Sequence, residues 1–73
     1  MEAISVTHKR LGQRIKQLRD ERDMTQEDLA FEAGVDRSYM GFIERGERNV
    51  TLSRLISICR KMKISLSELF MGL

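Results

Sequence analysis

Apolar residues recur at intervals of three and four along most of the chain, the spacing that places them on one face of an α-helix. The first such stretch, about residues 6–22, carries Leu11, Ile15 and Leu18 on one side and basic residues on the other. No segment alternates between apolar and polar residues over more than a few positions, as a half-buried strand would. The pattern therefore predicts an all-α protein.

Residues 25–45 have the parts of a helix-turn-helix. Thr25 is placed to cap a short helix that Gly34 ends, and Asp36 is placed to cap the next helix, which runs to about Arg45. Two short helices joined by a turn of about three residues with a glycine define this unit. The residues expected to pack the helices and shape the turn are Leu29, Ala30, Gly34, Val35, Met40 and Ile43. A helical hairpin in a small bundle without affinity for DNA is the alternative interpretation.

Two more helices are predicted after this unit. Thr51 precedes a helix over about residues 52–62, and Ser65 with Glu68 forms a capping box for a short helix that ends near Met71. We therefore expect a five-helix bundle in a single domain over residues 1–73. The apolar positions of about residues 52–73 cover a wider arc than one packing stripe needs, so this region is predicted to form a dimer surface. The candidate interface residues are Ile64, Leu66, Leu69, Phe70 and Leu73.

The composition of the chain excludes several classes of function. In a chain of 73 residues, Cys59 has no second cysteine to pair with, and one cysteine with the distant His8 makes neither a zinc site nor a nucleophile–base pair. We expect no metal, no cofactor, no small-molecule ligand and no enzymatic activity. No apolar run approaches the length of a membrane span and no signal peptide is evident, so a cytoplasmic protein is expected.

Charge is distributed unevenly although the net charge is only +2. Residues 23–36 carry five acidic groups and no Lys or Arg, whereas residues 1–22 carry six basic and three acidic groups. Residues 37–54 carry four basic and two acidic groups. A folded domain that turns one face toward phosphate would have such a pattern, so the basic segments are assigned to a DNA-facing side.

The helix after Asp36 is the candidate recognition helix. At 100° per residue, Met40 and Ile43 face inward, and the outward face carries Arg37, Ser38, Gly41, Phe42 and Arg45. Arg37 can make a bidentate contact with guanine, or contact phosphate or solvent alone, and Ser38 can bind a base edge or a phosphate. Phe42 is a candidate for contact with a thymine methyl group, or it packs against the following loop. Gly41 is expected to let the backbone approach the groove.

Contacts with the DNA backbone are expected around this helix. Thr25 and Gln26 lie at a helix N-terminus, where free N–H groups favour an anion. Tyr39 can hold a phosphate through its hydroxyl or fill the seam between helices. Arg45, Arg48 and Asn49 cluster in and beside the next loop as a candidate phosphate clamp, although each could be an ordinary surface residue.

Three runs of sequence carry a resemblance to a known family. They are LRDERDMTQEDLA at 18–30, DRSYM at 36–40 and IERGERN at 43–49. The chain resembles the Cro/C1-type (XRE) family of phage repressors, and more narrowly the controller proteins of restriction–modification systems.

The resemblance implies the phage-repressor type of five-helix fold and a DNA-binding transcriptional regulator. It also implies an ion pair between Arg19 and Glu44, base contacts from Arg37 and Ser38, and backbone contacts from Gln26, Tyr39 and the Arg48–Asn49 loop. The implied partners are a second copy of the chain and double-stranded DNA with a palindromic operator. A phage-type repressor or an antitoxin regulator would use the same parts.

Overall fold

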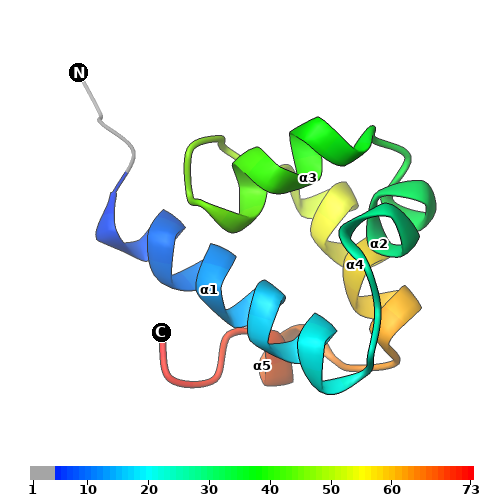
Figure 1. Ribbon diagram of the computed structural model, residues 1–73. Coiled ribbons are helices and arrows are strands. Elements are labelled where there is room, and N and C mark those ends of the chain that lie inside the picture. The colour runs from blue at the N-terminus through cyan, green and yellow to red at the C-terminus, as the bar shows by residue number, and fades with distance from the viewer. Residues whose placement is uncertain (1–4) are drawn as a thin grey trace.

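The computed structural model describes residues 5–73, which form five α-helices and, within that range, no strand (Figure 1). The helices are α1 (Val6–Glu21), α2 (Gln26–Ala33), α3 (Arg37–Glu44), α4 (Leu52–Met62) and α5 (Leu66–Leu69). The predicted all-α class and the five helices are confirmed. The last helix is shorter than predicted, because Phe70 already leaves the helical conformation.

Side-chain caps define where each helix begins. The residues that accept a hydrogen bond from a backbone N–H of the first turn are Ser5, Thr25, Asp36, Thr51 and Ser65. The last four of these are the caps that the sequence predicts. In the predicted capping box of α5, the Ser65 N–H also donates to Glu68 Oε1 at 3.1 Å. Local hydrogen bonds between residues three apart thus account for where the helices begin.

The turn between α2 and α3 depends on Gly34. Its φ of 74° lies in the left-handed region, which a residue with a side chain rarely adopts. In this conformation the Val35 N–H donates to Ala30 O at 3.0 Å and the Gly34 N–H to Phe31 O at 3.2 Å. Residues 34–36 therefore reverse the chain in the three-residue turn that a helix-turn-helix requires.

Every helix contributes one fully buried side chain to a single core. These are Ile15, Leu29, Met40, Ile58 and Leu69. The assignment of Leu69 to the dimer surface is wrong, since its exposure is 0%. The short helix α5 contacts both α1 and α4, so Leu69 closes the end of the core instead of facing solvent.

The arrangement of the helices leaves α2 and α3 together on one side of the molecule. In Figure 1, α1 runs below α3, while α5 lies at the opposite side of α1. Gly12 permits the close approach of α1 to α3, because a Cβ there would collide with the carbonyl oxygens of Ile43 and Glu44. None of the helices described is long and apolar enough to cross a membrane.

Candidate nucleic-acid interface

The recognition helix α3 presents its first residues to solvent. Arg37 and Ser38 are exposed at its N-terminus, directly after the cap Asp36, whose Oδ1 accepts from the Tyr39 N–H at 2.8 Å. Met40 and Ile43 are buried on the opposite side, as the helical spacing predicts. The two candidate base-contacting residues therefore stand at a free helix end, where a long side chain can extend beyond the fold.

Gln26 lies beside Arg37 although eleven positions separate the two residues. Arg37 Nη1 donates to Gln26 Oε1 at 3.4 Å, and Gln26 Nε2 donates to Glu44 Oε1 at 2.9 Å. The side-chain amide of Gln26 thus joins the beginning of α3 to its end. This contact gives Arg37 a preferred direction before any ligand binds.

Glu44 also forms the ion pair that the resemblance implies. Arg19 Nε donates to Glu44 Oε2 at 2.7 Å, and Arg19 Nη2 donates to Glu44 Oε1 at 3.0 Å. Both residues are buried, and Arg19 Nη1 donates further to the Met24 carbonyl at 2.7 Å. The hydrogen bonds to Glu44 raise the pKa of Arg19 above its ordinary value, against the opposing effect of burial.

Thr25 is engaged in the cap of α2. Its Oγ1 accepts from the Asp28 N–H at 3.1 Å, and its own N–H donates to Asp28 Oδ2 at 2.9 Å. The hydrogen bond from the Thr25 N–H, together with the Thr25 side chain, lowers the pKa of the Asp28 carboxyl below its ordinary value. The Asp28 carboxylate therefore already accepts from the Thr25 N–H, one of the backbone donors that we expected a phosphate to bind.

Tyr39 fills the seam between helices, which is one of the two roles left open by its sequence. Its ring is partly buried against the core, and its hydroxyl donates to the Asn49 carbonyl at 3.3 Å. The hydroxyl thereby ties α3 to the loop before α4. Asn49 and Arg48 are exposed in that loop.

Gly41, predicted on the outward face of α3, is covered by a neighbouring side chain. Gly41 is buried, and the nearest atom to a Cβ built there is Arg45 Nη1, at 3.1 Å. The Arg45 side chain therefore folds back over Gly41. Arg45 Nε also donates to Glu47 Oε1 at 3.2 Å in an exposed ion pair.

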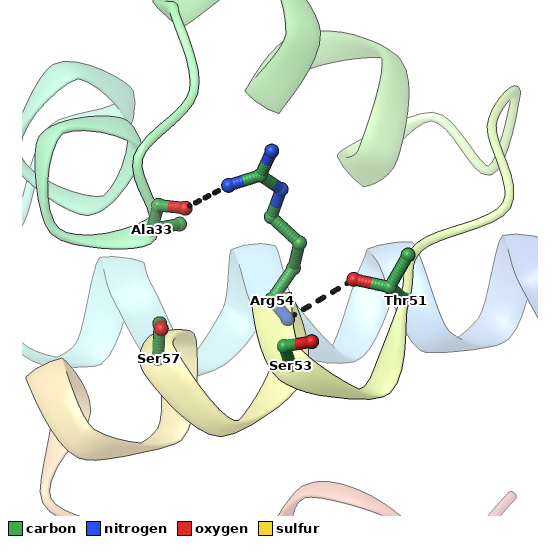
Figure 2. A pocket seen from close by; sticks show the side chains of 5 residues that line it. All are labelled: Ala33, Thr51, Ser53, Arg54 and Ser57. Carbon is green, nitrogen blue, oxygen red and sulfur yellow. Dashed lines mark hydrogen bonds between the residues drawn. The ribbon is translucent and has the colours of Figure 1, made fainter.

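Three arginines outside the predicted site stabilise helix ends. Figure 2 shows Arg54 reaching from α4 to the end of α2, where Nη1 donates to Ala33 O at 2.8 Å, and the same atom donates to Gly34 O at 3.3 Å. Arg22 Nε donates to Met62 O at 3.0 Å, and Arg14 Nη2 to Glu68 O at 2.8 Å. Each arginine compensates carbonyl groups that a helix end leaves without an intrahelical donor.

These contacts show that three of the six basic residues of the first basic segment bind groups of the protein itself. Arg14, Arg19 and Arg22 all bind carbonyl or carboxylate groups of the protein itself. No sequence signal marks the carbonyls of Glu68 and Met62, because they lie 54 and 40 positions from Arg14 and Arg22. The exposed arginines of the recognition helix and its following loop remain as candidates for DNA.

The described residues do not bring together a metal site: between Ser5 and Leu73, no three His, Cys, Asp or Glu residues cluster in a way that could hold an ion. Cys59 is buried, and burial raises the pKa of its thiol. The thiol is therefore protonated at neutral pH and packs as a small apolar group.

The arrangement of α2, the turn and α3 is that of a known family of helix-turn-helix proteins. A helix-turn-helix family model, HTH_3, matches residues 15–69. The chain belongs to the HTH_3 (Cro/C1-type) family. The matched range contains α2, α3, α4 and α5 entirely, together with the Arg19–Glu44 pair.

Relatives of this HTH_3 protein include restriction–modification control proteins. The control protein C.MunI from Mycoplasma sp is 45% identical over 62 residues, which cover 84% of each chain. C.SmaI from Serratia marcescens is 39% identical over 59 residues, covering 81% of this chain and 70% of the relative. The immunity repressor of Bacillus phage phi105 is 42% identical over 59 residues, but they span only 41% of that protein.

Solved structures of controller proteins share the fold. The restriction–modification controller protein C.AhdI from Aeromonas hydrophila matches with a TM-score of 0.86 and 41% identity, over 90% of this chain and all of that one. The controller protein C.Esp1396I, crystallised as a tetramer with its natural 35 base-pair operator, matches with a TM-score of 0.80 and 38% identity, over 90% of this chain and 87% of that one. The chain therefore belongs to a family of DNA-binding transcriptional regulators that are not enzymes.

The candidate dimer-interface residues of this HTH_3 chain differ in how far they are buried. Of the other candidate interface residues, Ile64 and Leu66 are partly buried against the core, whereas Phe70 and Leu73 are 41% and 37% exposed. Other large apolar side chains of the predicted dimer region that stay exposed are Leu52, Ile56 and Met71. Two helical regions therefore leave apolar area uncovered in the monomer.

Proposed function

We propose that this chain is the controller protein of a restriction–modification system, a transcriptional regulator that binds a palindromic operator as a homodimer. The observation that carries the proposal is the exposed N-terminus of α3, where Arg37 is held beside Gln26 of α2. Similarity to control proteins over most of the chain supports the biological setting. Such a regulator acts on DNA in the cytoplasm, which is the location we propose.

Arg37 and Ser38 are the proposed base contacts. Both are exposed, and Arg37 is the first residue of α3. A guanidinium can donate two parallel hydrogen bonds to O6 and N7 of guanine in the major groove, a geometry that no other base offers. The contact with Gln26 restricts the Arg37 side chain beforehand, which lowers the entropy lost on binding.

Contacts with the DNA backbone are proposed for the residues around the recognition helix. Gln26 lies at the start of α2, Tyr39 lies in the first turn of α3, and Asn49 is tied to α3 by the Tyr39 hydroxyl. Arg45 and Arg48 supply the positive charge of the following loop. The exposed Thr25 hydroxyl, which accepts from the Asp28 N–H in the cap, is the proposed phosphate contact at the start of α2.

Dimerisation is proposed through the C-terminal region. Phe70 and Leu73 expose apolar area, and Ile64 and Leu66 border it in sequence and are partly exposed. Self-association would bury this surface and place two recognition helices on one face of the duplex. The half-sites are then expected about one helical turn apart, roughly 34 Å.

Selection from a random duplex library with the purified chain tests the proposal. Sequencing of the bound fraction should show a palindrome, and sedimentation at micromolar concentration should give the dimer mass. A bound pool without any enriched sequence would contradict sequence-specific binding, and a monomer mass would contradict the dimer.

A phage-type repressor is the second candidate, supported by the similarity to the phi105 immunity repressor. The two functions differ in which promoter carries the operator. Fusing the DNA upstream of the neighbouring genes to a reporter would distinguish them: control of an endonuclease–methyltransferase pair supports the first, and control of phage genes supports the second.

A further inference from the structure

The ring of Phe42 lies under two guanidinium groups. The Cζ of Arg48 is 4.7 Å from the ring centroid, and the Cζ of Arg45 is 5.0 Å from it. Both distances are within the range at which a cation is attracted to an aromatic face. Because Phe42 belongs to α3 and Arg48 to the following loop, the ring joins the recognition helix to the candidate phosphate clamp.

Gly41 makes room for one of these arginines. The Arg45 side chain folds back over Gly41, where a Cβ would stand 3.1 Å from Nη1, tighter than ordinary van der Waals contact. The neighbouring Glu47 holds Arg45 Nε at 3.2 Å. The absence of a side chain at Gly41 therefore leaves room for Arg45 to stack on the Phe42 ring.

Stacking leaves the hydrogen-bond donors of a guanidinium free. In Arg19, by contrast, Nε, Nη1 and Nη2 all donate within the protein. Arg48 donates no hydrogen bond to another residue in the range 5–73 and is placed by the aromatic contact alone. Arg48 therefore retains all its guanidinium donors for a phosphate, and Arg45, whose Nε donates to Glu47, retains those on Nη1 and Nη2.

We propose that Phe42 is a positioning residue that orders Arg45 and Arg48 for contact with DNA phosphates. The sequence left two roles open for Phe42: contact with a thymine methyl group, or packing against the following loop. Two cations cover the ring, so the positioning role takes the place of the thymine contact. The inference rests on the proposed DNA-binding function. Loss of the ring should weaken binding to every sequence alike, whereas loss of a thymine contact should weaken binding only to the preferred sequence.

The test compares Phe42→Leu with Phe42→Tyr, and uses Phe31→Leu on α2 as the matched control, because Phe31 is 86% exposed and contacts neither arginine through an aromatic interaction. Binding is measured by fluorescence anisotropy at several salt concentrations. The probes are the duplex selected by the unmodified protein and a scrambled duplex of the same composition.

Phe42→Leu should weaken binding to both duplexes by the same factor, about threefold to tenfold for two exposed cation–π contacts. The slope of log K against log salt should flatten by between about 0.5 and 2, since fewer phosphates are neutralised. Phe42→Tyr should restore both quantities, and Phe31→Leu should leave both unchanged. Thermal unfolding of each variant separates these effects from loss of the fold.

Three results would overturn the proposal. Phe42→Leu that is folded and binds both duplexes as the unmodified protein does would exclude a positioning role. Loss confined to the selected duplex would establish a base contact instead. If the unmodified protein binds neither duplex, the proposed function fails and the role of Phe42 fails with it.

Discussion

Arg19 and Glu44 form a buried, two-bond ion pair between α1 and the last turn of α3, with donor–acceptor distances of 2.7 and 3.0 Å. The same carboxylate accepts from Gln26 Nε2, and Gln26 in turn accepts from Arg37. An arginine proposed to contact a base is therefore connected, through two side chains, to the charge that fixes α1 against α3.

Glu44→Gln should destabilise the protein strongly. The substitution keeps the shape of the side chain but leaves the Arg19 charge buried without a carboxylate, which costs about 3 kcal/mol in the free energy of unfolding. Urea denaturation measures the loss. Lys16→Gln is the matched control, because the Lys16–Asp20 pair at 3.0 Å is exposed and should contribute little to the free energy of unfolding. Equal losses in the two variants would refute the importance of burial.

Arg37→Ala should relax the sequence preference. Removing a bidentate contact to guanine is expected to weaken specific binding by about 1–3 kcal/mol and to abolish the preference at that base pair. Repeating the duplex selection with the variant provides the measurement. Arg60→Ala, an exposed arginine on α4, serves as the control and should leave the selected sequence unchanged. An unaltered preference in Arg37→Ala would assign base recognition to other residues.

Arg48→Ala should weaken binding to all duplexes by a similar factor. A phosphate contact carries no sequence information, and its loss should reduce the magnitude of the salt slope by about 0.9. Titrations of the selected and scrambled duplexes at several salt concentrations give both numbers. A change in the selected sequence itself would show instead that Arg48 reaches a base.

Asp28 should make the stability of α2 sensitive to acid. Hydrogen bonds from Thr25 lower the pKa of the folded-state carboxyl below its ordinary value of 3.8, so the stabilisation is present above that pH and is lost as the pH falls through the folded-state pKa. Asp28→Asn should therefore be less stable than the unmodified protein at pH 7. The difference between the two should shrink below about pH 4 in urea denaturation. A constant difference down to pH 2 would contradict the assigned role of the carboxylate.

Leu69 and Phe70 are neighbours that should respond differently to truncation. Leu69→Ala removes a fully buried side chain and should lower the free energy of unfolding by about 2–5 kcal/mol. Phe70 is 41% exposed, so Phe70→Ala should change unfolding less and should shift the monomer–dimer equilibrium toward the monomer. Sedimentation at a series of concentrations measures that shift. Dimerisation unaffected by Phe70→Ala would place the interface elsewhere.

Local chemistry alone predicts where α2, α3, α4 and α5 begin and where the chain turns between α2 and α3. Thr25, Asp36 and Ser65 each bind an N–H three residues ahead, and Gly34 satisfies a backbone requirement within its own turn. Such interactions close over a few residues and are therefore readable from spacing. The inward positions of α3 followed from helical periodicity for the same reason.

The tertiary structure decided which side chains are free. Spacing placed Leu69 and Phe70 together on a dimer surface, but the contacts of α5 with α1 and α4 bury Leu69 and leave Phe70 exposed. The basic segments looked alike in sequence, yet Arg54 closes the end of α2. Only the approach of the helices separates these residues, because burial and the partner of a long charged side chain depend on elements that are distant in sequence. Spacing and capping residues thus specify the helices and the helix-turn-helix, whereas packing selects which arginines and apolar groups remain available to DNA or a second subunit.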